Sequence, residues 1–163
     1  MRARGISQAR LLELFEYDRS TGLFKWKVSL SNRCPAGSTA GTLHTKGYIR
    51  ISIDRVFYYA HHLAWLYVYG VLPKILDHIN LNPSDNRIEN LRIASMRENQ
   101  ANRGLSKNNT SGVKGVRWES RRKKWVAKFG RHGYAGAYDD IDEAAEAYIR
   151  KARSFAGEFA RSA

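Results

Sequence analysis

The sequence has few of the features that mark secreted, disulfide-stabilised or membrane proteins. It has one cysteine, Cys34, so it can build neither an internal disulfide nor a cysteine-rich zinc site. Its longest apolar run, LAWLYVYGVL, is too short to span a bilayer. The first residues, MRARGISQARLLEL, lack the apolar core and the cleavage site of a signal peptide. We therefore expect a cytoplasmic protein without a membrane partner.

Acidic residues are also scarce. The 163 residues include 28 Lys and Arg but 15 Asp and Glu, which leaves a net charge of +13 and a pI near 10.1. A merely soluble basic protein is one explanation, but such an excess suits a polyanion, most simply a nucleic acid. Residues 103–131 hold ten bases and one acid, whereas residues 132–163 hold six acids and four bases. This asymmetry indicates that one face is reserved for phosphate.

Hydrophobic periodicity and turn residues predict short elements of both kinds in the first two thirds of the chain. Residues 48–59 alternate as a hairpin across Asp54 and Arg55, and a helix follows that ends at Gly70. Two short strands are expected around ILDHI and LRIA. The stretch SMRE is a capping-box pattern, with Ser95 as the cap, so it predicts a helix from Met96 to Arg103.

The last third reads as a small sheet followed by a helix. GVRW and KWVAKF are two predicted strands joined by the basic turn ESRRKK, YAGAY is a third, and a helix begins near Asp139. Strand alternation places Trp118 and Trp125 in the core and turns Arg117 and Lys128 the other way. The basic side chains expected to face nucleic acid are Lys114, Arg117, Arg121, Arg122, Lys123, Lys124, Lys128 and Arg131.

The stretch DHINLNPSDNRIENLRIASMRENQANR, residues 77–103, is rich in asparagine. It is either a solvated connector, in which Asn86 and Asn90 bond the loop to itself, or a site. A strand pair followed by a helix can bring together Asp77, His78 and Asn99. A carboxylate and an amide carbonyl are hard oxygen ligands suited to Mg²⁺ or Mn²⁺, and a histidine can take a proton from water. These groups together indicate a phosphodiesterase.

DHINLNPSDNRIENLR and the following ENQAN resemble the HNH endonuclease family, most closely its phage and homing-type members. AHHLAWLYVYG also resembles that family, although its second histidine stands where arginine is usual. The resemblance implies a ββα-metal fold that binds one divalent cation, Mg²⁺ or Mn²⁺. It makes Asp77 and Asn99 metal ligands, His78 the general base and Asn90 a brace for the loop. It also implies hydrolysis that leaves 5′-phosphate and 3′-hydroxyl ends.

The C-terminal segment resembles a second family. GVRW, the W-x-A-x-F strand, Gly136 before an aromatic position and EAAEAY resemble the Apetala-two domain of plant ethylene-response factors. That resemblance implies a three-stranded antiparallel sheet on one helix, with the sheet in the DNA major groove. Because YAGAY, Glu119 and Gly130 depart from the family pattern, no base preference is carried over.

Together the two resemblances predict an α+β protein: a ββα-metal HNH nuclease module followed by a three-stranded antiparallel sheet packed on one helix. The expected divisions are an N-terminal helix and β segment (1–46), the nuclease module (47–104), a linker (105–111) and the DNA-binding domain (112–163). The partner is double-stranded DNA, inside a bacterial host cell if the gene is phage-borne. The alternatives are a non-catalytic DNA-binding regulator with a vestigial nuclease fold and a structured-RNA binder. Target sequence and oligomeric state stay open.

Overall fold

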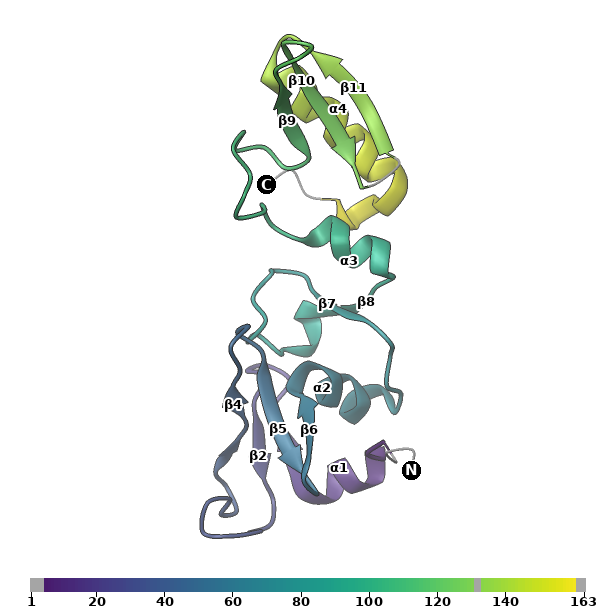
Figure 1. Cartoon of the computed structure of the whole chain (residues 1–163). Coiled ribbons are helices and arrows are strands. Elements are labelled where there is room, and N and C mark those ends of the chain that lie inside the picture. The colour runs from purple at the N-terminus through teal and green to yellow at the C-terminus, as the bar shows by residue number, and fades with distance from the viewer. Residues whose placement is uncertain (1–4, 131–132, 161–163) are drawn as a thin grey trace. The chain divides into compact units, whose positions relative to one another are not determined.

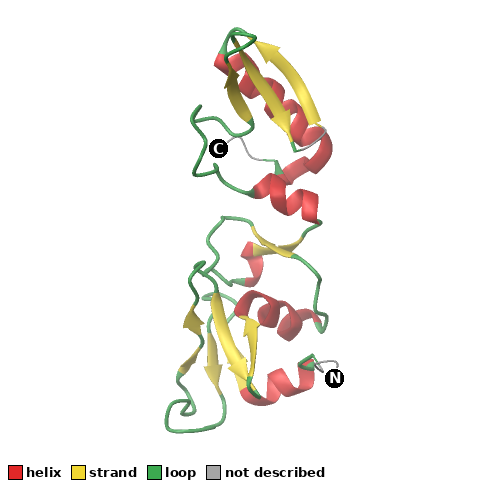
Figure 2. Ribbon diagram, in the orientation of Figure 1, coloured by secondary structure: helices red, strands yellow, loops and turns green. Residues whose placement is uncertain are grey.

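The computed structural model describes residues 5–130 and 133–160, and these form a mixture of helices and short strands (Figures 1 and 2). The chain divides into two compact units, Met1–Ile93 and Ala94–Ala163. The division falls inside the segment expected to form the nuclease module, so the two units are described separately. No helix among the described residues is long and apolar enough to cross a membrane.

The first unit is built from two three-stranded antiparallel sheets, two helices and a two-stranded pair. The sheets have the orders β1-β2-β3 and β4-β5-β6, and β7 pairs with β8. The elements are α1 (Gln8–Leu14), β1 (Phe15–Tyr17), β2 (Phe24–Trp26), β3 (Thr39–Ala40), β4 (Thr42–Leu43), β5 (Ile49–Ile53), β6 (Val56–Tyr59), α2 (Ala60–Tyr69), β7 (Leu76–His78), η1 (Ile88–Asn90) and β8 (Leu91–Ile93).

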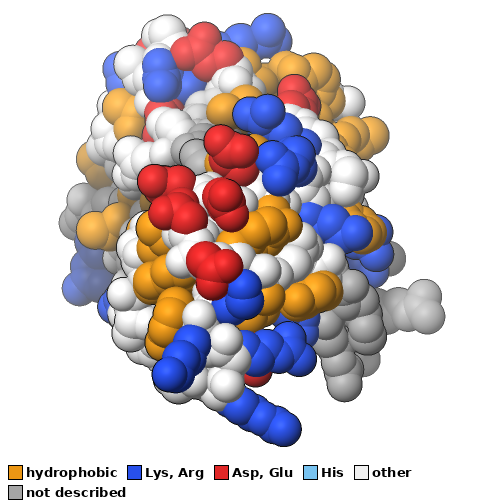
Figure 3. Space-filling view, turned by 90° about the horizontal axis from the view of Figure 1, so that it is seen from above, with side chains coloured by type: hydrophobic (Ala, Val, Ile, Leu, Met, Phe, Trp, Pro, Cys, Tyr) orange, Lys and Arg blue, Asp and Glu red, His pale blue; other side chains and the backbone are white. Residues whose placement is uncertain are grey.

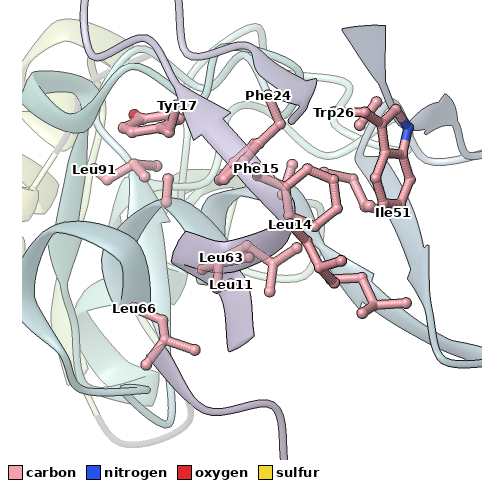
Figure 4. Close-up of a cluster of buried hydrophobic side chains, with 14 residues drawn as sticks. Leu11, Leu14, Phe15, Tyr17, Phe24, Trp26, Ile51, Leu63, Leu66 and Leu91 are labelled. Carbon is pink, nitrogen blue, oxygen red and sulfur yellow. The ribbon is translucent and has the colours of Figure 1, made fainter. Parts of the chain in front are cut away.

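The core of this unit forms where the sheets meet the two helices. In β1 and β2 every second residue is buried, because successive side chains of a strand point to opposite faces. Phe15 and Trp26 pack against each other there in a tilted arrangement, with ring centroids 4.3 Å apart. Apolar side chains from both helices and from β5 and β8 complete the cluster in Figure 4, which includes Leu11, Leu14, Ile51, Leu63, Leu66 and Leu91. α2 therefore has a buried face in the same cluster as Ile88 of η1 and Leu91 of β8.

The second unit is a three-stranded sheet with helices. α3 (Met96–Asn102) precedes β9 (Val116–Glu119), β10 (Lys124–Phe129) and β11 (Gly133–Tyr138), and α4 (Ile141–Ala156) and η2 (Gly157–Phe159) follow. The strands are antiparallel in the order β11-β10-β9. The capping box predicted at the start of α3 is confirmed, because Ser95 and Glu98 each accept a hydrogen bond from the other's backbone N–H.

One face of this sheet and one face of α4 share a hydrophobic core. Val116 and Ala127 from the sheet meet Ala144, Tyr148 and Ala152 from α4. The small alanine side chains let the helix lie close to the strands. The approach is closest at Gly115, where a Cβ atom would lie 2.2 Å from the Tyr148 ring and φ is +69°. Glycine is therefore required at that position.

The prediction that Trp118 is a core residue is wrong. Its side chain is 45% exposed, whereas Trp125, its cross-strand partner in β10, packs against the core. The two indole rings touch in a T-shaped contact at 5.2 Å. β9 is an edge strand of the sheet, so Trp118 has a neighbouring strand on one side alone. Alternation gave its face correctly but could not show how far the core extends beneath it.

Candidate active site and nucleic-acid interface

Asp77 and His78 lie on β7, and all three residues of that strand are buried. β7 pairs in antiparallel register with β8, so that Asp77 faces Arg92 and His78 faces Leu91. Asp77 is 5% exposed, and its Oδ2 accepts a hydrogen bond from Nε of Arg92 at 3.1 Å. The position of Arg92 opposite Asp77 depends on the strand register, so no local sequence pattern indicates it.

His78 is 6% exposed and lies among aromatic rings. The His61 ring of α2 meets it edge-on with centroids 4.9 Å apart, and the Tyr48 ring lies 5.9 Å away. Burial lowers the pKa of His78 below its ordinary value, although Asn86 and the charge of Asp77 act in the opposite direction. The imidazole is therefore neutral at physiological pH, which is the form that can accept a proton.

Asn86 was interpreted from the sequence as a residue that bonds its own loop. Its Nδ2 does donate to the backbone carbonyl of Ser84, at 3.1 Å. Its Oδ1, however, lies 3.5 Å from Nε2 of His78, so the side chain also faces the candidate base. The Tyr17 hydroxyl donates to the Asn86 backbone carbonyl at 2.7 Å and holds the residue there. This contact comes from β1, far away in the sequence, and no local pattern could have indicated it.

Asn90 ties together the loop between β7 and β8. Its Oδ1 accepts from the backbone N–H of Asn80 at 3.0 Å, and its Nδ2 donates to Asn80 Oδ1 and to the carbonyl of Asp85. Asp85 in turn pairs with Arg87, which holds the pKa of that carboxyl low, at about 2. The dense asparagine pattern thus builds a loop whose polar groups satisfy one another.

Asn99 lies on α3, in the second unit, and is half-buried. Its place as a second ligand stays a prediction. Among residues 5–130 and 133–160, no group of three or more His, Cys, Asp or Glu side chains is arranged to hold a metal ion. Asp77 nevertheless offers a hard carboxylate oxygen, and Mg²⁺ is commonly held by one or two carboxylates together with water and substrate phosphate. The donor chemistry at Asp77 fits such an ion.

The outer face of the β9–β10–β11 sheet carries basic side chains around a shallow hollow. Arg117, Arg122 and Lys128 are exposed and line this hollow together with Glu119, Val126 and Tyr134. Glu119 lies between two guanidinium groups, 4.0 Å from Arg117 and 4.0 Å from Arg122. Arg117 and Lys128 thus stand on the face away from α4.

The remaining predicted DNA contacts differ in their surroundings. Arg121 and Lys123 are exposed on the turn between β9 and β10, whereas Lys124 pairs with Asp139 at 2.8 Å. Figure 3 views the end of the second unit that carries this turn, and acidic side chains gather there among the basic ones. Acids near the start of α4 therefore offset part of the positive charge at this end. Arg131 lies outside the described residues.

Lys114 does not share the outer face, contrary to the expectation from alternation. Its ammonium group donates to the backbone carbonyls of Ala101 and Arg103 at the end of α3. Alternation does not apply to residue 114, because β9 begins at Val116. Lys114 thus connects the end of α3 to the segment before β9 within the second unit.

The comparisons with known proteins agree with the chemistry of the β7–β8 segment. The family model described as HNH endonuclease matches residues 58–101, a range that runs from β6 to α3. The chain therefore carries an HNH endonuclease domain, which implies a DNA substrate. The chain is also 35% identical over 107 residues to "Protein 3.8" of Escherichia phage T7, a match that covers 62% of this chain and 87% of that protein. The chain belongs to the family of that phage protein. No solved structure matches it.

Proposed function

We propose that this protein is a divalent-metal-dependent endonuclease that hydrolyses phosphodiester bonds in duplex DNA. The observation that carries the proposal is the buried Asp77–His78 pair on β7, within the segment that matches the HNH family. A carboxylate beside a neutral imidazole offers a metal ligand and a proton acceptor on neighbouring residues. Hydrolysis of a phosphodiester by water needs both.

In this proposal each residue of the segment has one role. His78 accepts the proton of the attacking water. Asn86 orients the imidazole through the contact between its own Oδ1 and Nε2 of His78. Asp77 and Asn99 would hold the divalent ion, which supplies charge stabilisation at the phosphate and the leaving oxygen when bound. Asn90 keeps the β7–β8 loop in shape. The P–O bond to the 3′ oxygen breaks in this proposal, so hydrolysis leaves 5′-phosphate and 3′-hydroxyl ends, as the resemblance to the HNH family implies.

We assign residues 47–104 to the nuclease module and residues 112–163 to an Apetala-two-like DNA-binding domain, linked by residues 105–111. The exposed basic face of β9 and β10 supports this assignment. A β-sheet can enter the major groove, and cationic side chains on its outer face can reach phosphates on both sides. The domain would position the chain on duplex DNA, as in homing-type enzymes. One active site per chain nicks a single strand, and a double-strand break requires a second chain or a second binding event.

Incubation of supercoiled plasmid with the full-length protein tests this proposal, with Mg²⁺ in one arm and a chelator in the other. We expect nicked circles in the Mg²⁺ arm alone, and sequencing of the ends should show 5′-phosphates and 3′-hydroxyls. A protein that binds the duplex in both arms but never cuts it would instead be a DNA-binding regulator with a vestigial nuclease fold. Cleavage of structured RNA in place of duplex DNA would identify a different substrate.

A further inference from the structure

The Arg92–Asp77 ion pair involves the same carboxylate that is proposed to bind metal. Arg92 lies directly opposite Asp77 in the antiparallel pair, and its Nε approaches Oδ2 at 3.1 Å. Both side chains are shielded from water, with 6% of the Asp77 side chain and 17% of the Arg92 side chain exposed. A buried carboxylate is strongly unfavourable without a counter-charge, and the Arg92 guanidinium supplies that counter-charge.

A cation that approaches Asp77 also meets the positive charge of Arg92. The guanidinium of Arg92 carries a fixed positive charge, which lies against the Asp77 carboxylate. A divalent ion therefore meets a carboxylate whose charge Arg92 already balances, and the guanidinium repels the ion. No cluster of three or more His, Cys, Asp or Glu side chains in the described ranges offers additional anionic ligands. The free protein should thus attract divalent ions weakly.

We propose that Arg92 is a positioning residue that acts as a built-in competitor of the metal. It holds the Asp77 carboxylate in a fixed orientation in the free protein, and it lowers the affinity for divalent ions until a DNA phosphate adds negative charge. Metal binding is thereby linked to DNA binding. This inference rests on the proposed role of Asp77 as a ligand.

Mn²⁺ binding to the full-length protein without DNA tests the inference, with free Mn²⁺ measured by electron paramagnetic resonance. Arg92→Gln removes the competing charge, and we expect it to bind Mn²⁺ about tenfold more tightly than wild type or better, as loss of a like charge at contact distance implies. Arg92→Lys keeps a positive charge that pairs less closely with the carboxylate, so its affinity should fall between the two. The matched control is Arg10→Gln, which removes an ion-paired arginine of α1 in the first unit and should leave the affinity unchanged.

Thermal unfolding with and without Mn²⁺ gives a second readout. Arg92→Gln leaves a buried carboxylate without its counter-charge, so Mn²⁺ should raise its unfolding temperature more than that of wild type. If Arg92→Gln does not fold in the absence of metal, Mn²⁺ should restore folding. The inference would be overturned if Arg92→Gln fails to fold both with and without Mn²⁺ while Arg92→Lys binds Mn²⁺ like wild type.

Asp77→Asn separates this inference from the proposed function. If Asp77→Asn abolishes Mn²⁺ binding while both Arg92 variants bind like wild type, Asp77 is a ligand and the role of Arg92 is refuted. If Asp77→Asn binds Mn²⁺ as well as wild type does, the ligand assignment itself fails. We expect Arg92→Gln to bind Mn²⁺ more tightly than wild type. This gain should disappear in the double variant Arg92→Gln, Asp77→Asn.

Discussion

Removal of two charges from the outer face of the C-terminal sheet should flatten the salt dependence of DNA binding. Arg117 and Lys128 are exposed there, on the face opposite α4, and the nearest acid to Arg117 is Glu119 at 4.0 Å. The double variant Arg117→Gln, Lys128→Gln keeps the side-chain stems that cover the buried Val126. We therefore expect it to fold normally, since exposed charges contribute little to stability.

The size of the effect follows from counterion release. Each phosphate neutralised contributes about 0.9 to the slope of log affinity against log salt, so loss of two contacts should reduce the slope by about 1.8. Between about 50 and about 200 mM salt, wild type should then lose about twelvefold more affinity than the double variant. Fluorescence anisotropy of one labelled duplex across this series, without divalent metal, measures both slopes.

A charge-matched control comes from α4. Arg150 and Arg153 are exposed on that helix, which covers the opposite face of the sheet. The double variant Arg150→Gln, Arg153→Gln removes the same net charge and should leave the slope close to that of wild type. Equal slopes for the two double variants would refute the assignment of the outer face as the DNA-binding surface.

Three further predictions concern stability. Asn90→Ala removes three hydrogen bonds of the β7–β8 loop and should lower the free energy of unfolding, measured in urea, by about 2–4 kcal/mol. A loss below about 1 kcal/mol would contradict the bracing role of Asn90. Gly115→Ala should lower the free energy of unfolding by about 3 kcal/mol, because the added Cβ meets the Tyr148 ring. Gly130→Ala, whose added Cβ meets nothing within 4 Å, should lower it by about 1 kcal/mol. Similar losses for the two variants would be inconsistent with this packing. Burial holds the pKa of His61 at about 2 against an ordinary 6.5, so the folded state excludes a proton that the unfolded chain binds. The free energy of unfolding should therefore fall as pH drops from 7 to 5, by up to about 1.4 kcal/mol per pH unit. The fall should be shallower in His61→Phe. Parallel pH profiles for His61→Phe and wild type would argue against this contribution of His61.

Local patterns in the sequence predicted the elements well where the determining interactions are local. The hairpin of β5 and β6 turns at Asp54 and Arg55, and both residues have positive φ, as a tight two-residue hairpin turn requires. The capping box of α3 formed as expected because its hydrogen bonds span three residues. Each of these features depends on neighbouring residues alone.

The sequence could not show contacts that depend on register or on distant elements. The Arg92–Asp77 pair needs the register of β7 and β8, and the position of Asn86 beside His78 depends on Tyr17 of β1. Strand alternation predicted Lys114 on the outer face, but residue 114 precedes the start of β9 and its ammonium group reaches the end of α3. The residues proposed for chemistry were visible as a motif, but the residues that orient them were not.

The most direct test of the account is the nicking rate of His78→Ala in Mg²⁺, measured beside its affinity for the same duplex. A general base contributes about 10²–10⁴ to the rate, and phosphate contacts elsewhere set the affinity. His44→Ala, a histidine substitution between β4 and β5, serves as the control and should cut like wild type. We expect His78→Ala to lose at least about a hundredfold in nicking rate with its affinity for the duplex nearly unchanged. A His78→Ala protein that nicks DNA at the wild-type rate would contradict the account.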